Sequence, residues 1–184
     1  MAMGILVGIF RLATGRADGF ARFDPTPQAF MTSLAPLLGL PIVGFLMMLA
    51  DGQALSGLGD LLATGCAVLA PPVISHALAR AWGREAQWLR FAVAFNWCQW
   101  VIPMAVALVL LASELAVEAG LPIGVAAIGA TCLLAGYGLW LHFFLARRGL
   151  GLPRGRAVLL VLAINVGTLL LAMGPRLLAY ATAA

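Results

Sequence analysis

The sequence predicts an all-α integral membrane protein, a polytopic bundle of five transmembrane helices preceded by an amphipathic helix at the membrane interface. Two observations lead to this prediction. Hydrophobic residues make up 63% of the 184 residues and charged residues only 10%, which leaves too little polar surface for a water-soluble domain. Five separate apolar stretches also reach the roughly 20 residues that a helix needs to cross the hydrocarbon core.

Ahead of these stretches lies an N-terminal segment, so we divide the chain into residues 1–25 and a transmembrane domain of residues 26–184. Ile5, Ile9 and Leu12 recur at helical spacing and predict an amphipathic helix that is interrupted by Arg11 and Arg16. We expect this helix to lie along the cytoplasmic surface. The segment has no basic n-region and no small-residue cleavage site, so we expect it to be retained.

The five predicted spans are residues 30–50, 61–80, 89–112, 121–146 and 157–173. The first follows Thr26, a good N-cap residue, with Pro27 in the favoured first helical position. Proline inside a span is tolerated in membranes but distorts the helix. We therefore expect bends in the first span and at Pro103 in the third, and a break in the second at Pro71 and Pro72.

Arginine positions predict the orientation, because cytoplasmic loops of membrane proteins carry an excess of basic residues. Arginines lie before the first span, between the second and third, and between the fourth and fifth. The charged residues of the first and third loops are all acidic. This alternation predicts a bacterial inner-membrane protein with a cytoplasmic N-terminus and a periplasmic C-terminus. We expect contacts with anionic lipid headgroups from Arg11, Arg16, Arg84, Arg147, Arg148 and Arg154.

Polar side chains inside the spans gather in the predicted cytoplasmic half of the membrane, within about 6 to 14 Å of the cytoplasmic arginines by helical rise. An amide facing lipid would leave donors and acceptors unpaired, so we expect these side chains to face other helices. They either join helices by hydrogen bonds or line a cavity for a ligand or a lipid headgroup. The set is His76, Asn96, Gln99, His142 and Asn165.

Several classes of function are disfavoured by the residues present. All acidic residues lie in loops or termini, so no acid/base pair lies within a span, and we expect no enzyme. The basic residues are scattered rather than arranged on one face, which disfavours nucleic-acid binding. We expect no metal and no cofactor, with one alternative left open. His76 and His142 lie at similar depth and meet the minimum requirement for bis-histidine ligation of a haem.

Three phrases resemble segments of known proteins: FDPTPQAFMTSL before the first span, FNWCQW in the third and AGYGLWLHFFLARRGLG at the end of the fourth. They look like a group of small bacterial membrane proteins of uncharacterised function. With the short lead and five spans, the architecture resembles the Yip family of five-helix membrane proteins, whose eukaryotic members take part in vesicle trafficking. The resemblance implies the fold but no catalytic residues. The DLxGP-type motif of eukaryotic Yip proteins is not found, so the resemblance does not extend to a small-GTPase partner.

The sequence therefore predicts a non-enzymatic membrane protein that acts through helix association. Its expected role is that of a structural or accessory subunit of a larger membrane assembly, or of a membrane-organising factor. We expect its partners to be the lipid bilayer, anionic lipids, and either another membrane protein or further copies of this chain. The alternative from another class is a small-solute or lipid transporter with its polar site in the cytoplasmic leaflet, gated at the predicted break in the second span.

Overall fold

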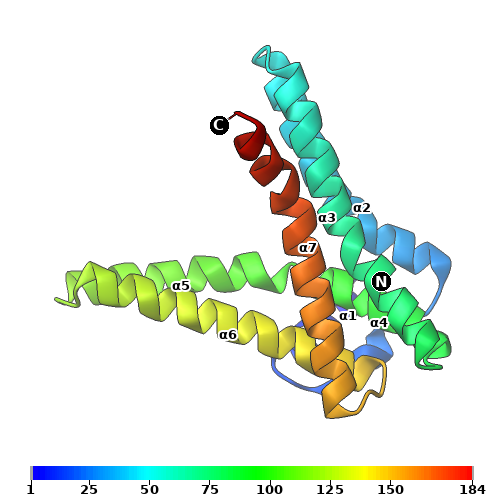
Figure 1. Cartoon of the computed structure of the whole chain (residues 1–184). Coiled ribbons are helices and arrows are strands. Elements are labelled where there is room, and N and C mark those ends of the chain that lie inside the picture. Colours follow the sequence, from blue (N-terminus) through cyan, green and yellow to red (C-terminus); the bar gives the residue numbers. More distant parts are fainter. Residues whose placement is uncertain (1, 184) are drawn as a thin grey trace.

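A computed structural model describes the backbone of residues 2–183 and the side chains of residues 3–174. Every regular element in this part of the chain is helical, which confirms the all-α prediction (Figure 1). The elements, in order, are α1 (Ala2–Ala13), the 3-10 helix η1 (Ala17–Arg22), α2 (Pro27–Ala50), α3 (Ala54–Ala81), α4 (Glu85–Cys98), α5 (Val101–Glu118), α6 (Ile123–Gly149) and α7 (Arg154–Ala183).

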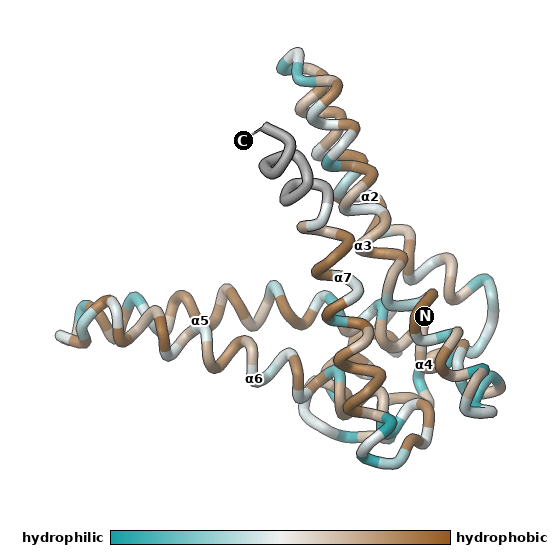
Figure 2. Tube along the Cα trace, in the orientation of Figure 1, coloured by the Kyte–Doolittle hydropathy of each residue, from teal (hydrophilic) through white to brown (hydrophobic). Residues whose placement is uncertain are grey.

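Five helical stretches are long and apolar enough to cross a membrane: α2, α3, α4 together with α5, α6, and α7 as far as Gly174. Their outer surfaces carry many exposed large hydrophobic side chains. Hydrophilic residues gather at the helix tips and at the end where the helices converge (Figure 2). Because so extensive an apolar exterior is stable only against an apolar surrounding, the structure fits a multi-pass membrane protein.

The helices form two arms that diverge from a common base (Figure 1). We define the base as residues 2–23, 74–98 and 139–164. In the three-helix arm, residues 34–73 and 165–174, α3 packs along both α2 and α7. In the hairpin arm, residues 101–138, α5 packs mainly on α6. The arms point in clearly different directions, so their apolar sides do not meet along their lengths.

The hydrophobic core lies in the base and is centred on α4. Residues 91–96 and Cys98 of this helix are all buried. Leu12, Phe20 and Phe23 of the N-terminal segment are buried in the same core. α1 and η1 therefore pack into the base together with α4 and α6.

The N-terminal helix α1 differs from the prediction in one respect. It continues through Arg11 to Ala13, although an interruption at Arg11 was expected. Its outward face is also apolar, since Met3, Leu6 and Phe10 are exposed. At 12 residues it is too short to span a bilayer. α1 thus has one face in the core of the base and an exposed face that is largely apolar.

The predicted break in the second span at Pro71 and Pro72 is wrong, because α3 is one continuous helix of 28 residues. Neighbouring helices can hold a proline-containing membrane helix together. α3 lies between α2 and α7, the two helices with which it makes its most extensive contacts. Packing against α2 and α7 therefore supports a continuous α3, and this packing could not be predicted from the sequence of α3 alone.

The third predicted span, in which a bend at Pro103 was expected, consists of two helices joined by a turn. α4 ends at Cys98 and α5 begins at Val101. Proline has no N–H, so Pro103 cannot donate the helical bond to the carbonyl oxygen of Gln99 four residues earlier. Ile102 N donates to that oxygen instead, at 3.3 Å, in a tighter turn. This turn directs α5 away from the base and into the hairpin arm.

Candidate ligand-binding cavity

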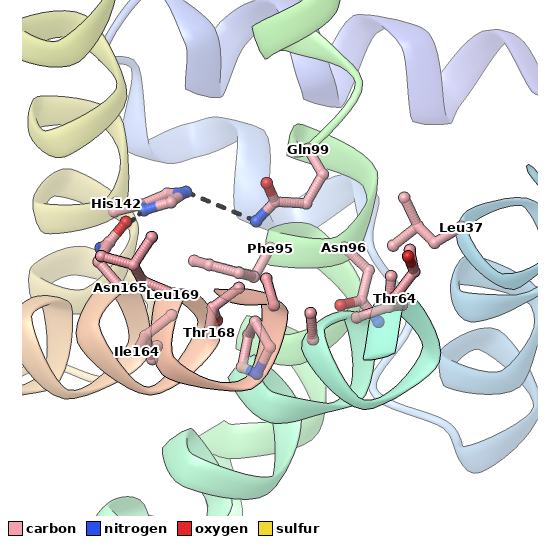
Figure 3. Close-up of a pocket in the computed structure, with 14 residues that line it drawn as sticks. Leu37, Thr64, Phe95, Asn96, Gln99, His142, Ile164, Asn165, Thr168 and Leu169 are labelled. Atoms are coloured by element: carbon pink, nitrogen blue, oxygen red, sulfur yellow. Dashed lines mark hydrogen bonds between the residues drawn. The ribbon is translucent and has the colours of Figure 1, made fainter. Parts of the chain in front are cut away.

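A cavity of about 440 Å³ lies where the two arms leave the base (Figure 3). Its walls come from α2, α3, α4, α6 and α7. Four of the five polar residues predicted from the sequence line it together, although they lie on three different helices. These are Asn96, Gln99, His142 and Asn165. The structure thus brings together four of the five polar residues that were predicted to lie at similar depth. Binding of a ligand by them stays a prediction.

His142 on α6 is held between two side-chain amides. Asn165 Nδ2 donates to the carbonyl oxygen of Val161 at 2.8 Å and lies 3.3 Å from His142 Nδ1. A carbonyl only accepts, so the amide nitrogen must face it, and His142 Nδ1 is therefore the acceptor of the second Asn165 N–H. His142 Nε2 faces Gln99 Nε2 at 3.5 Å, at the outer limit of hydrogen-bond length (Figure 3).

Asn96 on α4 joins the cavity to α2. Its Nδ2 donates to Ser33 Oγ at 3.0 Å, and Ser33 Oγ donates to the carbonyl oxygen of Phe30 at 2.7 Å. Both side chains are buried, with Asn96 2% and Ser33 0% exposed. Within the described residues, the side-chain oxygen of Asn96 has no hydrogen-bond partner. Asn96 therefore serves both as a link between helices and as a hydrogen-bonding group of the cavity wall.

Two further polar residues of the cavity, Thr64 and Thr168, were not predicted from the sequence. Thr168 Oγ1 is buried and, in the described part of the chain, has no hydrogen-bond partner. Threonine in a membrane helix commonly bonds to its own backbone, so its presence alone carries little information. A signal was nevertheless available, because Thr168 follows Asn165 by three residues and so lies on the same helix face.

His76 does not line this cavity. Its Nε2 lies 3.4 Å from Glu85 Oε1, and its ring stacks edge-on against Trp88 at 4.6 Å between centroids. Trp88 Nε1 in turn donates to Ser75 Oγ at 3.0 Å. His76 thus belongs to a cluster that ties the end of α3 to the start of α4. Because bis-histidine ligation needs two imidazoles facing one macrocycle, this geometry does not favour a haem between His76 and His142.

The arginines predicted to contact anionic lipids lie in the segments that form the base. Arg11 and Arg16 both approach Asp18, at 2.7 and 3.6 Å, so this carboxylate partly neutralises them. Arg84 lies beside Gly151 in the loop between α6 and α7. Arg147 and Arg148 end α6, and Arg154 begins α7. Arg16, Arg148 and Arg154 are the exposed members of the set. Binding of lipid headgroups by these side chains stays a prediction.

The chemistry of the cavity is that of uncharged hydrogen bonding on an apolar background. None of its lining residues, all within the described part of the chain, is Asp, Glu, Lys or Arg. The lining contains amides, two hydroxyls and an imidazole, and the rest is aliphatic apart from Phe95, whose ring lies 4.9 Å from that of His142. No protein family, curated protein or solved structure matches this chain. The resemblance to the Yip family therefore stays a prediction.

Proposed function

We propose that this membrane protein binds a polar ligand in the cavity between its two arms, as a carrier or binding protein for a small solute or a lipid. One observation supports this most directly, namely the hydroxyl of Thr168, a residue of the cavity lining, which is buried and among the described residues lacks a hydrogen-bond partner. A buried polar atom without a partner costs about 1 to 3 kcal/mol. A ligand that bonds to it would remove that cost.

Interhelical hydrogen bonding alone explains only some of the polar residues. Ser33 pairs with Asn96, and Asn165 pairs with His142, so these contacts join helices. Thr168 and the oxygen of Asn96 are not used in this way. A volume of about 440 Å³ also falls within the range of roughly 300 to 1,000 Å³ found for small-molecule sites and far exceeds the ~30 Å³ of one water molecule.

Native mass spectrometry of the intact protein released from mild detergent tests this proposal. Ala172→Phe fills the cavity from α7, whereas Ala127→Phe makes the same change at an exposed position of α6 outside it. We expect a bound mass adduct on the unmodified protein and on Ala127→Phe, and its loss from Ala172→Phe. An adduct that survives in Ala172→Phe, or no adduct on any of the three proteins, would contradict the proposal.

A second candidate is the role of accessory subunit in a larger membrane assembly, and the hairpin arm favours it. None of the residues of α5, all of which are described, is buried. Large apolar side chains such as Leu108 and Leu111 are exposed along this helix. A helix of another membrane protein that packed on α5 would gain interhelical van der Waals contact, the main source of association in lipid.

Extraction of the tagged full-length chain into native nanodiscs, at its natural expression level, tests the subunit role. We expect one partner at a fixed ratio to the chain, measured by quantitative mass spectrometry of the purified particles. Leu108→Ala with Leu111→Ala, on the exposed face of α5, should reduce that ratio, while Leu159→Ala with Leu162→Ala on exposed positions of α7 should not. A chain recovered without any stoichiometric partner would rule out this role.

A further inference from the structure

We infer that the cavity takes an uncharged lipid whose head carries a hydroxyl group, such as a diglyceride or a long-chain alcohol. This inference rests on the proposed binding function and names the chemical class of the ligand. Three properties of the cavity lead to it: the side from which it opens, the absence of charge among its described lining residues, and an unused hydrogen-bond acceptor in its wall.

The cavity is accessible from the membrane interior. Thr64 and Leu169, on its rim, are exposed. They lie on α3 and α7, and their side chains are among those that line the cavity (Figure 3). His142 is five residues from Arg147, which places its Cα about 7.5 Å along the helix from that charge. A ligand that enters at this depth comes from the hydrocarbon layer, so it carries an apolar tail.

The lining excludes a charged head. An anionic phosphate or a cationic amine buried at this depth would need a countercharge, because burying an unpaired charge costs several kcal/mol or more. Among the described residues of the lining, none supplies such a charge. The exposed arginines of the base lie instead at the helix ends, where they are suited to charged headgroups outside the cavity. The group bound inside is therefore polar but neutral.

The cavity wall also holds a hydrogen-bond acceptor that is not used. Asn96 Nδ2 donates to Ser33 Oγ, and within the described residues Asn96 Oδ1 has no hydrogen-bond partner. Asn96 is one of the lining residues, so this oxygen is available to a ligand. An acceptor that stays unpaired in a buried site costs free energy unless a donor reaches it.

This unused acceptor selects for a ligand that donates. A quinone or an ester presents only acceptor oxygens and would leave Asn96 Oδ1 unpaired, whereas a hydroxyl both donates and accepts. Its hydrogen can be received by Asn96 Oδ1, while its oxygen can accept from Thr168 Oγ1. A hydroxyl therefore satisfies Asn96 and Thr168 together, which within the described residues lack these partners, and the aliphatic lining contacts the tail.

The test uses the full-length protein in phosphatidylcholine nanodiscs with photoactivatable lipids that carry a diazirine in the acyl chain. One probe is a 1,2-diacylglycerol and its matched control is the 3-acetyl derivative, which lacks the hydroxyl. A photoactivatable isoprenoid alcohol tests whether the ligand is a long-chain alcohol rather than a diglyceride. Photoactivatable phosphatidylglycerol represents a lipid with a charged head. We expect crosslinks mapped to cavity residues to be about fivefold stronger for a hydroxyl probe than for the acetyl control, equivalent to one hydrogen bond.

Two matched variants connect the labelling to the cavity. Thr168→Val keeps the side-chain shape and should lower labelling by the hydroxyl probes about fivefold. Thr131→Val makes the same change on α6, where Thr131 is exposed and bonds only to the carbonyl of Ala127, and should leave labelling unchanged. Equal labelling by the acetyl control, or stronger labelling by phosphatidylglycerol, would overturn the inference.

The two proposals can fail separately. If no lipid probe labels the cavity but the native adduct is still lost in Ala172→Phe, the site binds a soluble ligand, so the lipid class is wrong and the binding function stands. If cavity labelling and the adduct are both absent, the binding function fails as well.

Discussion

α4 and α5 are the two halves of one predicted span, but they differ in burial: α4 lies in the core and α5 is exposed. α4 contains Glu85, Arg90 and Asn96, yet it is the central buried helix of the core. α5 is apolar without exception from Val101 to Ala112, yet none of its residues is buried. This reverses the pattern of a water-soluble protein. When the surrounding solvent is hydrocarbon, the most apolar helix can remain outside and the helix with polar groups requires protein partners.

Glycines show the same contrast between the base and the hairpin arm. A Cβ added at Gly149 would lie 2.9 Å from ring atoms of Phe20 and Phe91, so only glycine permits this close packing. A Cβ at Gly129 in the hairpin arm would meet nothing within 4 Å. The base is therefore packed tightly at Gly149, as protein interiors are, whereas the hairpin arm is open at Gly129. The comparison predicts that equal substitutions will have unequal effects in the two regions.

Leucine truncation should show the largest difference. Leu145 is fully buried in the base, whereas Leu111 on α5 is 56% exposed. We expect Leu145→Ala to lower the free energy of unfolding by about 2 to 5 kcal/mol, because it leaves a cavity in packed protein. Leu111→Ala should change it by about 0.5 kcal/mol or less. Unfolding by sodium dodecyl sulfate in mixed micelles, followed by tryptophan fluorescence, measures both, and similar losses would contradict the contrast between base and arm.

Added methyl groups should give the next largest effect. Gly149→Ala forces the Phe20 and Phe91 rings to move and should destabilise the protein by about 1 to 3 kcal/mol. Gly129→Ala finds open space inside a helix and should be neutral or stabilising, since alanine favours a helix by about 1 kcal/mol over glycine. Thermal unfolding in detergent provides the comparison. Equal melting temperatures for the two variants would show that the base is not tightly packed at Gly149.

Loss of the buried hydrogen bond to Asn96 should have a moderate effect. Ser33→Ala leaves Asn96 Nδ2 without its acceptor and should cost about 1 to 2 kcal/mol. The neighbouring Thr32→Ala is the control, because Thr32 is exposed and bonds only to the Gln28 carbonyl of its own helix. The same unfolding assay applies. A larger loss for Thr32→Ala than for Ser33→Ala would mean that the link between α2 and α4 contributes little.

The smallest effect concerns the attachment of α1 to α6. Tyr137 OH donates to the carbonyl oxygen of Ala13 at 3.0 Å, at the end of α1. Tyr137→Phe removes one interhelical bond, worth about 0.6 kcal/mol in membrane proteins, so amide exchange in residues 2–13 should rise about threefold. Hydrogen-exchange mass spectrometry checks this, with peptides of α3 as the internal reference. Faster exchange throughout the chain would show that the bond supports the whole fold rather than α1 alone.

The sequence predicts features that depend on composition and local chemistry. Hydropathy located the five long apolar helices, Pro103 explained the turn at Gln99, and helical depth grouped four of the cavity residues. Features that depend on tertiary packing were missed. The continuity of α3 through Pro71 and Pro72 depends on neighbouring helices, and the divergence of the arms depends on contacts that apolar residues of similar hydropathy do not distinguish. Thr168 was missed because only its surroundings show that its hydroxyl lacks a partner.

The long helices of the two arms have a consequence for the bilayer itself. α3 has 28 residues and α6 has 27, which correspond to lengths of about 42 and 40 Å by helical rise. The hydrocarbon core is about 30 Å thick, so a helix of each arm exceeds it. Since the arms also diverge, lipids beside them must thicken, thin or tilt by different amounts, at fractions of a kcal/mol per Å of mismatch. The energy of this protein in a membrane therefore depends on local thickness, which favours some regions of a heterogeneous bilayer over others.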